Sequence, residues 1–434
     1  MARYRYIWRL SASMRDVVDV LLLTTYDTDG AGKFAHQLAD SVGGLGYSTR
    51  VICVQNRSED VKTFGLIDNS WIQKIQYRLV EEFYRRAVRP RPEYAFIHMQ
   101  ALPDKLVLGS SVWPDACNMI ICTFLSGMIS PAALTEIYRR YGQPRIIFYG
   151  VDMNLYTAGC HYAQDCIGYM RECQNCPAVP WFARKKVHRA FREKRGCYAA
   201  LTPVVVASSH EQHEQLSKSS LLKNARIEKI LMAVDEQLFG KHEATRSALK
   251  RRYGIGGRTI LIRSSSEPRK GCERFVQAIR KISRELPEIL SNTTIVAIGD
   301  QFIASQLNGL NVKVFSPGYI ADEGRLSEIY SLADVFLMTS TADSGPVMLA
   351  QSLMSGTPVI STDVGLARDL ICSGRNGEIL DNTNGEALVE GIVRFLRKTD
   401  DELGLMRRNA RELAHGKFSK VIYTEQLKKL VRGC

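Results

Sequence analysis

Short apolar runs alternate with longer amphipathic segments along the whole chain, and this alternation predicts parallel strands connected by helices. The first apolar run covers residues 17–25, and a second covers residues 48–54. Between them, residues 33–42 have helical spacing and end at a pair of glycines, which is typical of a helix C-terminus. A strand, a helix and a second strand in this order predict a doubly wound α/β domain.

The alternation starts again in the middle of the chain, which predicts two domains of similar size. In the first half, further strands are expected at residues 94–99, 119–124, 145–149 and 204–207. In the second half, strands are expected at residues 259–263, 294–298 and 334–338. We assign residues 1–235 to one Rossmann-like domain and residues 236–410 to another. The last helical segment, residues 411–434, is expected to pack back on the first domain.

The most informative stretch is residues 339–363, which follow an apolar run typical of a strand. A polar loop with Asp343 leads into an apolar helical segment that contains Gln351. A helix that starts just after a parallel strand presents its free N–H groups, here those of Val347 and Met348, to an anion such as phosphate. The alternative is an ordinary strand–helix–strand connection in which Asp343 and Gln351 are bonded within the chain.

Charge narrows the class of partner. The 434 residues include 58 Lys and Arg against 45 Asp and Glu, which gives a formal net charge of +13. Such an excess favours nucleotides, nucleic acid or anionic lipid as partners. The densest basic blocks, residues 85–91 and 184–195, are either phosphate-binding surfaces or solvated helix faces. No apolar run of about 18 residues occurs and no signal peptide is recognised, so a cytoplasmic protein is expected.

Four of the eleven cysteines are clustered: Cys160, Cys166, Cys173 and Cys176. The last two have the tight spacing of zinc ligands, so a structural zinc with four thiolates is predicted, and His161 could replace one of them. The alternatives are reduced core thiols, which suit a cytoplasm, or two disulfides. A catalytic zinc is not expected, because four ligands close the coordination sphere.

The order of motifs in the second half resembles the nucleotide-sugar-binding domain of retaining glycosyltransferases of family 4. The matching pieces are residues 267–271 (EPRKG), 299–300 (GD), 318–319 (GY), 334–336 (DVF) with Ser340, 356–360 (GTPVI) and 363–365 (DVG). Residues 25–28 (TYDT) and 159–162 (GCHY) with the trailing cysteines look like a subgroup of these enzymes. The resemblance covers roughly residues 17–420 and implies the GT-B fold, in which two Rossmann-like domains face each other across a cleft.

The resemblance also implies a role for the matching residues. Arg269 and Lys270 would hold the donor's diphosphate, since Arg supplies a bidentate fork and Lys a compact charge. Ser340 and Asp343 would meet the donor sugar, and Gln351 would meet the ribose. The other donor-binding positions are Gly30 and Gly32, which let a loop of the first domain approach the donor, Arg263 as a further cation, and Tyr319 and Ile320 beside the base.

Two departures from the family pattern stand out. The family usually has two glutamates eight positions apart, where this chain has Asp343 and Gln351. Asp343 keeps the charge with a shorter reach, and Gln351 keeps only hydrogen-bonding capacity. Relatives often have His-Asp near the acceptor, and this chain has Val151-Asp152, which leaves Asp152 as the polar group there. A non-catalytic, glycosyltransferase-like scaffold is therefore an open alternative.

We predict a glycosyltransferase of the hexosyltransferase type that uses a nucleotide-sugar donor. No cofactor is expected for catalysis, because cations and a helix N-terminus can stabilise the leaving diphosphate. No carboxylate is clearly placed as a nucleophile, so front-face transfer with retention is expected. The expected acceptor is a glycan or a polyprenyl-linked saccharide of cell-surface polysaccharide biosynthesis, reached by a peripheral protein at the cytoplasmic face of an anionic membrane. A nucleic-acid-binding protein is the less favoured alternative, since the cysteines do not match a zinc knuckle and the aromatic residues are not patterned as a stacking platform.

Overall fold

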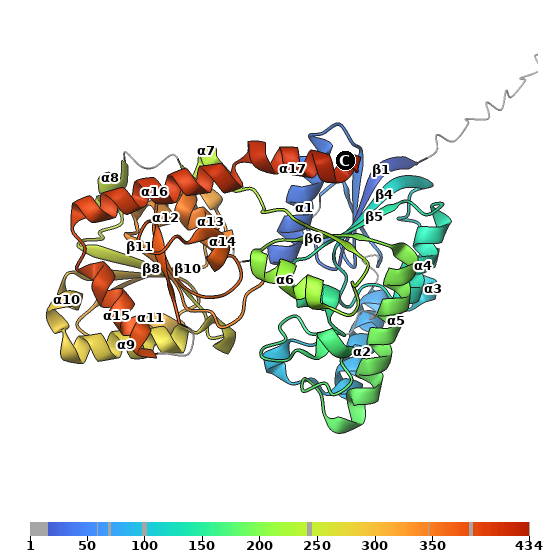
Figure 1. The fold of residues 1–434 in the computed structure, drawn as a ribbon, viewed down its shortest axis with the longest axis horizontal. Helices are drawn as coiled ribbons and strands as arrows, with labels where there is room; N and C mark the ends of the chain where they lie inside the picture. The colour runs from blue at the N-terminus through green and yellow to red at the C-terminus, as the bar shows by residue number, and fades with distance from the viewer. Residues whose placement is uncertain are drawn as a thin grey trace, which may run out of the picture.

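The computed structural model describes residues 16–58, 60–67, 71–97, 102–240, 245–345, 347–381 and 385–433. They form two α/β domains that lie side by side (Figure 1). Every pairing between neighbouring strands is parallel in both sheets. The fold class predicted from the sequence, two Rossmann-like domains, is confirmed. No helix among the described residues is long and apolar enough to span a bilayer.

The first domain is built on a seven-stranded sheet in the order β3-β2-β1-β4-β5-β6-β7. Its strands are β1 (Val17–Thr24), β2 (Thr49–Cys53), β3 (Thr63–Gly65), β4 (Ala116–Phe124), β5 (Arg145–Tyr149), β6 (Val204–Ala207) and β7 (Arg226–Lys229). Its helices are α1 (Asp29–Gly43), α2 (Trp71–Val88), α3 (Asp104–Gly109), α4 (Pro131–Arg140), α5 (Arg184–Leu201) and α6 (His210–Lys218). The strand predicted at residues 94–99 is wrong where the structure describes it, because a 3-10 helix covers Pro92–Tyr94 and Phe96 forms only one bridge, to Cys160. Residues 98 and 99 lie outside the described residues.

The second domain has a six-stranded sheet in the order β10-β9-β8-β11-β12-β13. Its strands are β8 (Arg258–Ser264), β9 (Thr293–Gly299), β10 (Lys313–Gly318), β11 (Val335–Met338), β12 (Val359–Thr362) and β13 (Gly377–Leu380). Its helices are α7 (Glu236–Phe239), α8 (Arg246–Arg252), α9 (Cys272–Glu285), α10 (Pro287–Ser291), α11 (Phe302–Gln306), α12 (Glu323–Leu332), α13 (Val347–Met354), α14 (Ala367–Leu370), α15 (Gly385–Leu396) and α16 (Asp400–Phe418), followed by α17 (Lys420–Arg432). The strand order reverses between β8 and β11, and a crevice opens at the carboxyl ends of strands where such a reversal occurs.

The central strands of the second sheet are buried on both faces. On β8, Leu261 packs into one core cluster while Ile260 and Ile262 pack into the other. On β11, Phe336 and Leu337 divide between the same two clusters. Helices cover both faces of such a sheet, so its strands read as continuous apolar runs and could be recognised in the sequence.

The buried carboxylate of Asp334 ties several elements of the second domain together. Arg246 Nη2 lies 2.5 Å from one of its oxygens, and Lys250 Nζ lies 2.8 Å from the other. Arg407 of α16 bonds the same carboxylate, and the backbone N–H of Thr259 donates to it at 2.8 Å. Burial opposes ionisation, but these cations keep the pKa of Asp334 below its ordinary value. The start of β11 is thus fastened to α8, α16 and β8.

The C-terminal helix returns to the first domain. Helix α16 runs along the second domain, and α17 continues from it over α1 and the first sheet (Figure 1). Tyr423 and Leu427 of α17 share a core cluster with Phe34 of α1. Where α16 gives way to α17, the backbone N–H of Val234 donates to the carbonyl of Phe418 at 3.0 Å. The chain therefore crosses between the domains twice, at neighbouring places.

Candidate active site

Two loops meet at the carboxyl ends of β8 and β11 in the second domain. Gly271 has φ +65°, and a Cβ atom there would lie 2.0 Å from the carbonyl oxygen of Thr339. Glycine is therefore required for the loops to approach this closely. The hydroxyl of Thr339 donates to the carbonyl of Lys270 at 2.9 Å. The backbone N–H of Thr341 donates to the carbonyl of Arg269 at 2.8 Å. These bonds fix the predicted diphosphate-binding pair at the switch point of the sheet.

Two cations of this loop face a single carboxylate. Lys270 Nζ lies 2.6 Å from Asp343 Oδ2, and Arg269 Nη1 lies 3.6 Å from the same oxygen. Arg269 also bonds Glu267 at 2.9 Å and the carbonyl of Ala342 at 2.9 Å. Burial lowers the pKa of Lys270, and Asp343 only partly offsets this. Lys270 and Asp343 are both largely buried, so their charges act in a medium that screens them weakly.

Helix α13 begins directly behind this loop. Its first residues, Val347 and Met348, pack half-buried against the core, which holds the first turn of the helix at the carboxyl end of β11. Gln351 follows one turn later and is also half-buried. Ser340 is buried, and its carbonyl accepts from the hydroxyl of Thr362 at 2.5 Å. The helix N-terminus is thus positioned as an anion site requires.

The remaining predicted donor residues of this domain lie around the same loops. Arg263 is exposed on β8, and its charge helps to lower the pKa of Lys270, after the larger effect of burial. Tyr319 follows β10 directly and is 76% exposed, whereas Ile320 is half-buried against the core. An exposed aromatic ring at the carboxyl edge of a sheet is available to a planar base.

The first domain faces this cluster across a small pocket of about 120 Å³ that both domains line. The ring of Tyr162 lies under the guanidinium of Arg269, with 4.1 Å between the guanidinium carbon and the ring centroid. Asp343 and Ser344 line the same pocket. The hydroxyl of Ser208 donates to the carbonyl of Ser344 at 3.3 Å. Residues of the two domains are therefore in direct contact at the predicted donor site.

Glu211 is a carboxylate of the interdomain pocket that sequence reasoning missed. It accepts from the backbone N–H of Gly365 in the second domain and from the side chain of Gln215 at 3.0 Å. Burial raises its pKa above the ordinary value for a glutamate. Nearby, Lys229 bonds Asp369 of α14 at 2.9 Å. The sequence signal that could have identified Glu211 is its position in the first turn of α6, the helix that follows β6.

Asp152 has a partner that the sequence analysis did not assign to it. His161 Nδ1 contacts one oxygen of Asp152, and the backbone N–H of Asn154 donates to the other at 2.8 Å. His161 stacks near Phe124 with ring centroids 5.0 Å apart, and its Nε2 atom is buried with no hydrogen-bond partner. A histidine therefore stands beside Asp152 in space although Val151 precedes it in sequence. Neither side chain lines the interdomain pocket, but Tyr162, which follows His161, does.

The two glycines of the first domain lie inside a helix and not in a loop. Helix α1 begins at Asp29, so the expectation of a helix starting only at residue 33 was wrong. At Gly32, a Cβ atom would lie 2.3 Å from the backbone of Asp27. The chain's own close packing accounts for that glycine without a ligand. Gly30 has no neighbouring atom within 4 Å of such a Cβ, and the space beside it is open.

The four clustered cysteines are free thiols in this structure, and no disulfide joins any of them. Cys160, Cys173 and Cys176 are buried, and Cys166 is half-buried. A hydrogen bond from Cys160 lowers the pKa of Cys176 below the ordinary value for a thiol. Among the described residues, no group of three or more His, Cys, Asp or Glu side chains has the arrangement of a metal site. The structural zinc stays a prediction from the sequence.

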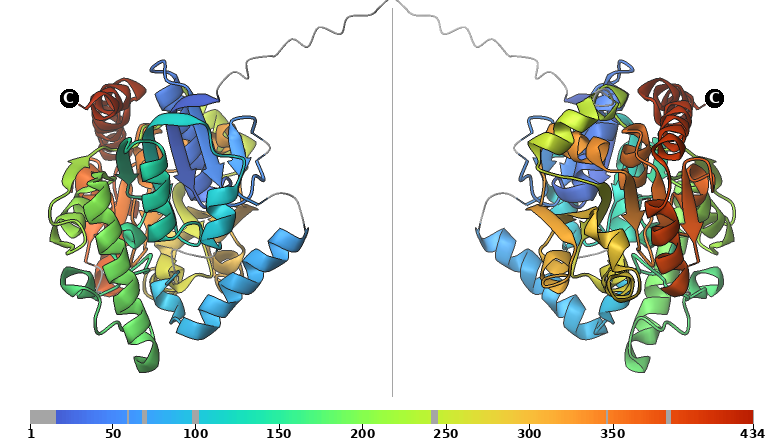
Figure 2. Two further views of the ribbon diagram at one scale, coloured as in Figure 1. Left: turned by 90° about the vertical axis from the view of Figure 1, so that its right-hand side faces the viewer. Right: turned by 90° about the vertical axis from the view of Figure 1, so that its left-hand side faces the viewer.

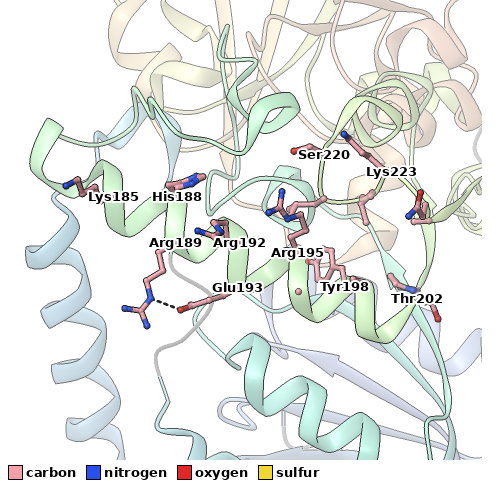
Figure 3. Close-up of a pocket in the computed structure, with 17 residues that line it drawn as sticks. Lys185, His188, Arg189, Arg192, Glu193, Arg195, Tyr198, Thr202, Ser220 and Lys223 are labelled. Carbon is pink, nitrogen blue, oxygen red and sulfur yellow. Dashed lines mark hydrogen bonds and ion pairs between the residues drawn. The ribbon is translucent and has the colours of Figure 1, made fainter.

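A larger, open pocket of about 980 Å³ lies along α5 in the first domain (Figure 3). Its lining is rich in cations: Lys185, Arg189, Arg192, Arg195 and Lys223. Arg189 bonds Glu193 at 2.9 Å, and Arg195 bonds Glu172. No ion pair is found for Lys185, Arg192 or Lys223 within the part of the chain that the structure describes. The pocket shares no lining residue with the interdomain pocket and coincides with the basic block at residues 184–195.

Comparison with known proteins matches the second domain to a family. Residues 247–413 match the model of "Glycosyl transferases group 1". The chain is 27% identical over 245 residues to mannosylfructose-phosphate synthase of Agrobacterium fabrum, which covers 53% of each chain. It is 26% identical over 184 residues to the GDP-mannose-dependent alpha-(1-6)-phosphatidylinositol monomannoside mannosyltransferase of Mycolicibacterium smegmatis, covering 39% of this chain and 47% of that one. The chain thus spans about half the length of the curated relatives it matches.

Solved structures resemble the whole chain. The crystal structure of Anabaena HepE in complex with UDP aligns with a TM-score of 0.63 at 14% identity, over 96% of this chain and 100% of that one. A likeness at this identity shows the fold alone. It confirms the two-domain GT-B arrangement that the motifs implied.

Proposed function

We propose that this protein is a glycosyltransferase that moves a sugar from a nucleotide-sugar donor to a saccharide acceptor. One observation carries the proposal: Arg269 and Lys270 converge on Asp343 at the switch point of the second sheet, beside the N-terminus of α13 and opposite the first domain. The family match covers this same domain.

The donor lies with its diphosphate on Lys270, Arg269 and the first N–H groups of α13. Phosphate oxygens replace part of the contact that Asp343 now makes with the two cations, which frees that carboxylate to accept hydrogen bonds from sugar hydroxyls. Ser340 assists at the sugar, Gln351 bonds the ribose, and the base rests near Tyr319. Support for a nucleotide comes from the similar fold of Anabaena HepE, whose crystal structure is a complex with UDP.

The transfer breaks the bond between the sugar's anomeric carbon and the diphosphate oxygen, and it forms a bond to an acceptor oxygen. Negative charge develops on the diphosphate, where preorganised cations and N–H groups stabilise it. The acceptor hydroxyl's proton passes to the departing phosphate oxygen. Asp343 is assigned to the sugar hydroxyls and no other carboxylate is placed as a nucleophile, so the proposal is front-face transfer with retention and without a metal.

The acceptor is a glycan or a lipid-linked saccharide of cell-surface polysaccharide biosynthesis, approached from the first domain. Asp152, oriented by His161, serves the acceptor side. The exposed basic residues of α5 support a peripheral position on the cytoplasmic face of an anionic membrane. The name of the mycobacterial relative, a phosphatidylinositol monomannoside mannosyltransferase, agrees with a lipid-borne acceptor.

Two measurements test the proposal together. UDP or GDP should raise the melting temperature of the full chain, whereas an oligonucleotide should not. A screen of nucleotide sugars with mass-spectrometric detection should find slow donor hydrolysis with one of them. Nucleotide binding without turnover of any donor or acceptor would identify a scaffold, and stabilisation by oligonucleotides alone would identify a nucleic-acid-binding protein.

A further inference from the structure

Helix α2 presents an apolar stripe to solvent. Trp71, Ile75, Leu79 and Phe83 are spaced four residues apart, so they lie along one face of the helix. Their exposed fractions are 70%, 45%, 63% and 68%. The other face of the helix meets the first domain, where Val88 is buried and Tyr77 packs against the core. The apolar stripe therefore faces away from the core. A contiguous apolar face of this kind marks an interaction surface in a soluble fold.

A second exposed aromatic group adjoins the end of this helix. Trp181 and Phe182, in the 3-10 helix Trp181–Ala183, are 79% and 45% exposed. The guanidinium of Arg89 lies 5.8 Å from the ring centroid of Phe182, and the N–H of Arg91 donates to the carbonyl of Ala178 at 2.8 Å. These contacts hold the segment after α2 against the start of α5. Figure 2 shows α2 standing out from the body of the first domain.

The charge around this apolar surface is positive. Lys185 and Lys186 follow the two aromatic residues and are exposed, and neither has an ion pair among the described residues. On α2, Arg85 and Arg86 share one carboxylate, Glu82, at 2.7 and 2.6 Å. Apolar and aromatic side chains rimmed by Lys and Arg are the composition of an interfacial helix, whose apolar face enters the boundary between headgroups and acyl chains.

We propose that α2, together with Trp181 and Phe182, seats the protein in the interfacial layer of an anionic lipid bilayer. The apolar face of α2 enters the boundary between the headgroups and the acyl chains, and Lys185 and Lys186 bind the lipid phosphates. This goes beyond a purely electrostatic attachment of the basic blocks, because apolar insertion survives salt that screens charges. It does not depend on which sugar is transferred, so vesicle binding and donor turnover can fail separately.

Sedimentation of the full chain with vesicles tests the proposal. The vesicles contain phosphatidylglycerol and phosphatidylcholine, and the comparison vesicles contain phosphatidylcholine alone. We expect binding to the anionic vesicles that persists in part at about 1 M salt, where the Debye length is only about 3 Å. The double variant Leu79→Ser/Phe83→Ser should weaken binding by about tenfold or more, because two apolar side chains no longer leave water.

The matched control is Leu405→Ser/Val421→Ser, which removes two exposed apolar side chains, 52% and 70% exposed, from α16 and α17. It should bind as the unmodified chain does. Lys185→Gln/Lys186→Gln should weaken binding at low salt and leave the salt-resistant part. All of these positions are exposed, so melting temperatures should stay close to that of the unmodified chain.

Tryptophan fluorescence gives a second readout. Emission should shift to the blue on anionic vesicles, and Trp71→Phe/Trp181→Phe should lose that shift. Absence of vesicle binding, binding lost entirely at high salt, or equal binding by the α2 variant and the control would each overturn the proposal. So would a lipid-free dimer in light scattering that Leu79→Ser/Phe83→Ser abolishes, because the stripe would then belong to a second copy.

Discussion

The two domains handle their cations in opposite ways. In the second domain, Arg246, Lys250 and Arg407 surround one buried carboxylate, and Lys270 is bonded to another. In the first domain, Lys185 and the other cations of α5 are mostly exposed. Lys194 is the exception, because it is buried and donates to the carbonyls of Asn154 and Thr157 at 2.7 and 3.0 Å.

The difference separates two uses of positive charge. A buried cation has a fixed geometry and a strong field, so it can fasten elements together or stabilise one developing charge. Exposed cations are screened and individually weak, so they act by their number on an extended anionic surface. Lys and Arg therefore fasten the core of the second domain, and on the proposed function they would also stabilise the diphosphate there and contact an anionic surface in the first domain.

The largest effect is expected at Asp334. Asp334→Asn leaves three cations around a neutral amide, and breaking a buried charge network of this kind costs about 3–5 kcal/mol of unfolding free energy. The loss should appear in denaturant unfolding followed by circular dichroism. Glu193→Gln in the first domain, which breaks the exposed pair with Arg189, should change stability by less than about 0.5 kcal/mol. Equal losses of unfolding free energy in the two variants would contradict the contrast between buried cations in the second domain and exposed cations in the first.

Acidification tests the same network. The pKa of Asp334 is below its ordinary value in the folded protein, so its contribution is fully present above the pKa of the unfolded carboxyl. As the pH falls through the lower folded value, that contribution is lost. Asp334→Asn should therefore be less sensitive to pH than the unmodified chain across the acidic range. An unchanged pH dependence of the melting temperature would contradict the assignment.

Lys270→Ala should act on chemistry and not on the fold. Removing one preorganised group that stabilises transition-state charge costs about 2–4 kcal/mol, measured as the loss of kcat/KM with the donor found in the screen. Lys185→Ala, which removes an exposed cation from the first domain, should leave turnover of a soluble acceptor unchanged. If both variants turn over normally, the diphosphate does not lie on Lys270.

Asp343 and Gln351 test which residue of the proposed site contacts the donor sugar and which contacts the ribose. Asp343→Asn should lower kcat more than it lowers nucleotide affinity, because Asp343 is assigned to the sugar. Gln351→Ala should do the reverse, by about tenfold in affinity, since it removes one hydrogen bond to the ribose and leaves a partner unpaired. Calorimetry with the nucleoside diphosphate and steady-state kinetics separate the two. Parallel losses in both variants would end this division of roles.

The smallest effect on activity is expected in the cysteine loop of the first domain. Cys173→Ser should lower the melting temperature without a specific loss of kcat, because Cys173 is buried away from the interdomain pocket. Metal analysis of protein purified without a histidine tag should find about one zinc per chain, as a closed four-ligand site requires. Metal-free protein with four titratable thiols would identify reduced core cysteines instead.

The sequence predicted that Arg269, Lys270 and Asp343 lie near one another, because each follows directly after an apolar strand of the second sheet. Arg269 and Lys270 follow one strand and Asp343 follows another, and parallel strands bring their carboxyl ends to one edge. Tyr162 and Glu211 were not predicted at this site, since only the docking of the two domains brings them next to Arg269 and Gly365. His161 was named only as a possible zinc ligand, and its place beside Asp152 was not predicted because it depends on how the cysteine loop folds back.

The two neighbouring crossings between the domains have a mechanical consequence. Val234 is hydrogen-bonded to Phe418, and Lys420 Nζ lies 2.7 Å from Asp235, so the outgoing and returning chain are joined at one point. Two joined connections act as a hinge: they resist sliding and permit rotation about an axis through them. A rotation about that axis would part Tyr162 from Arg269 and Glu211 from Gly365. For the nucleotide-sugar donor that we propose, opening the site and closing it would then be a single movement.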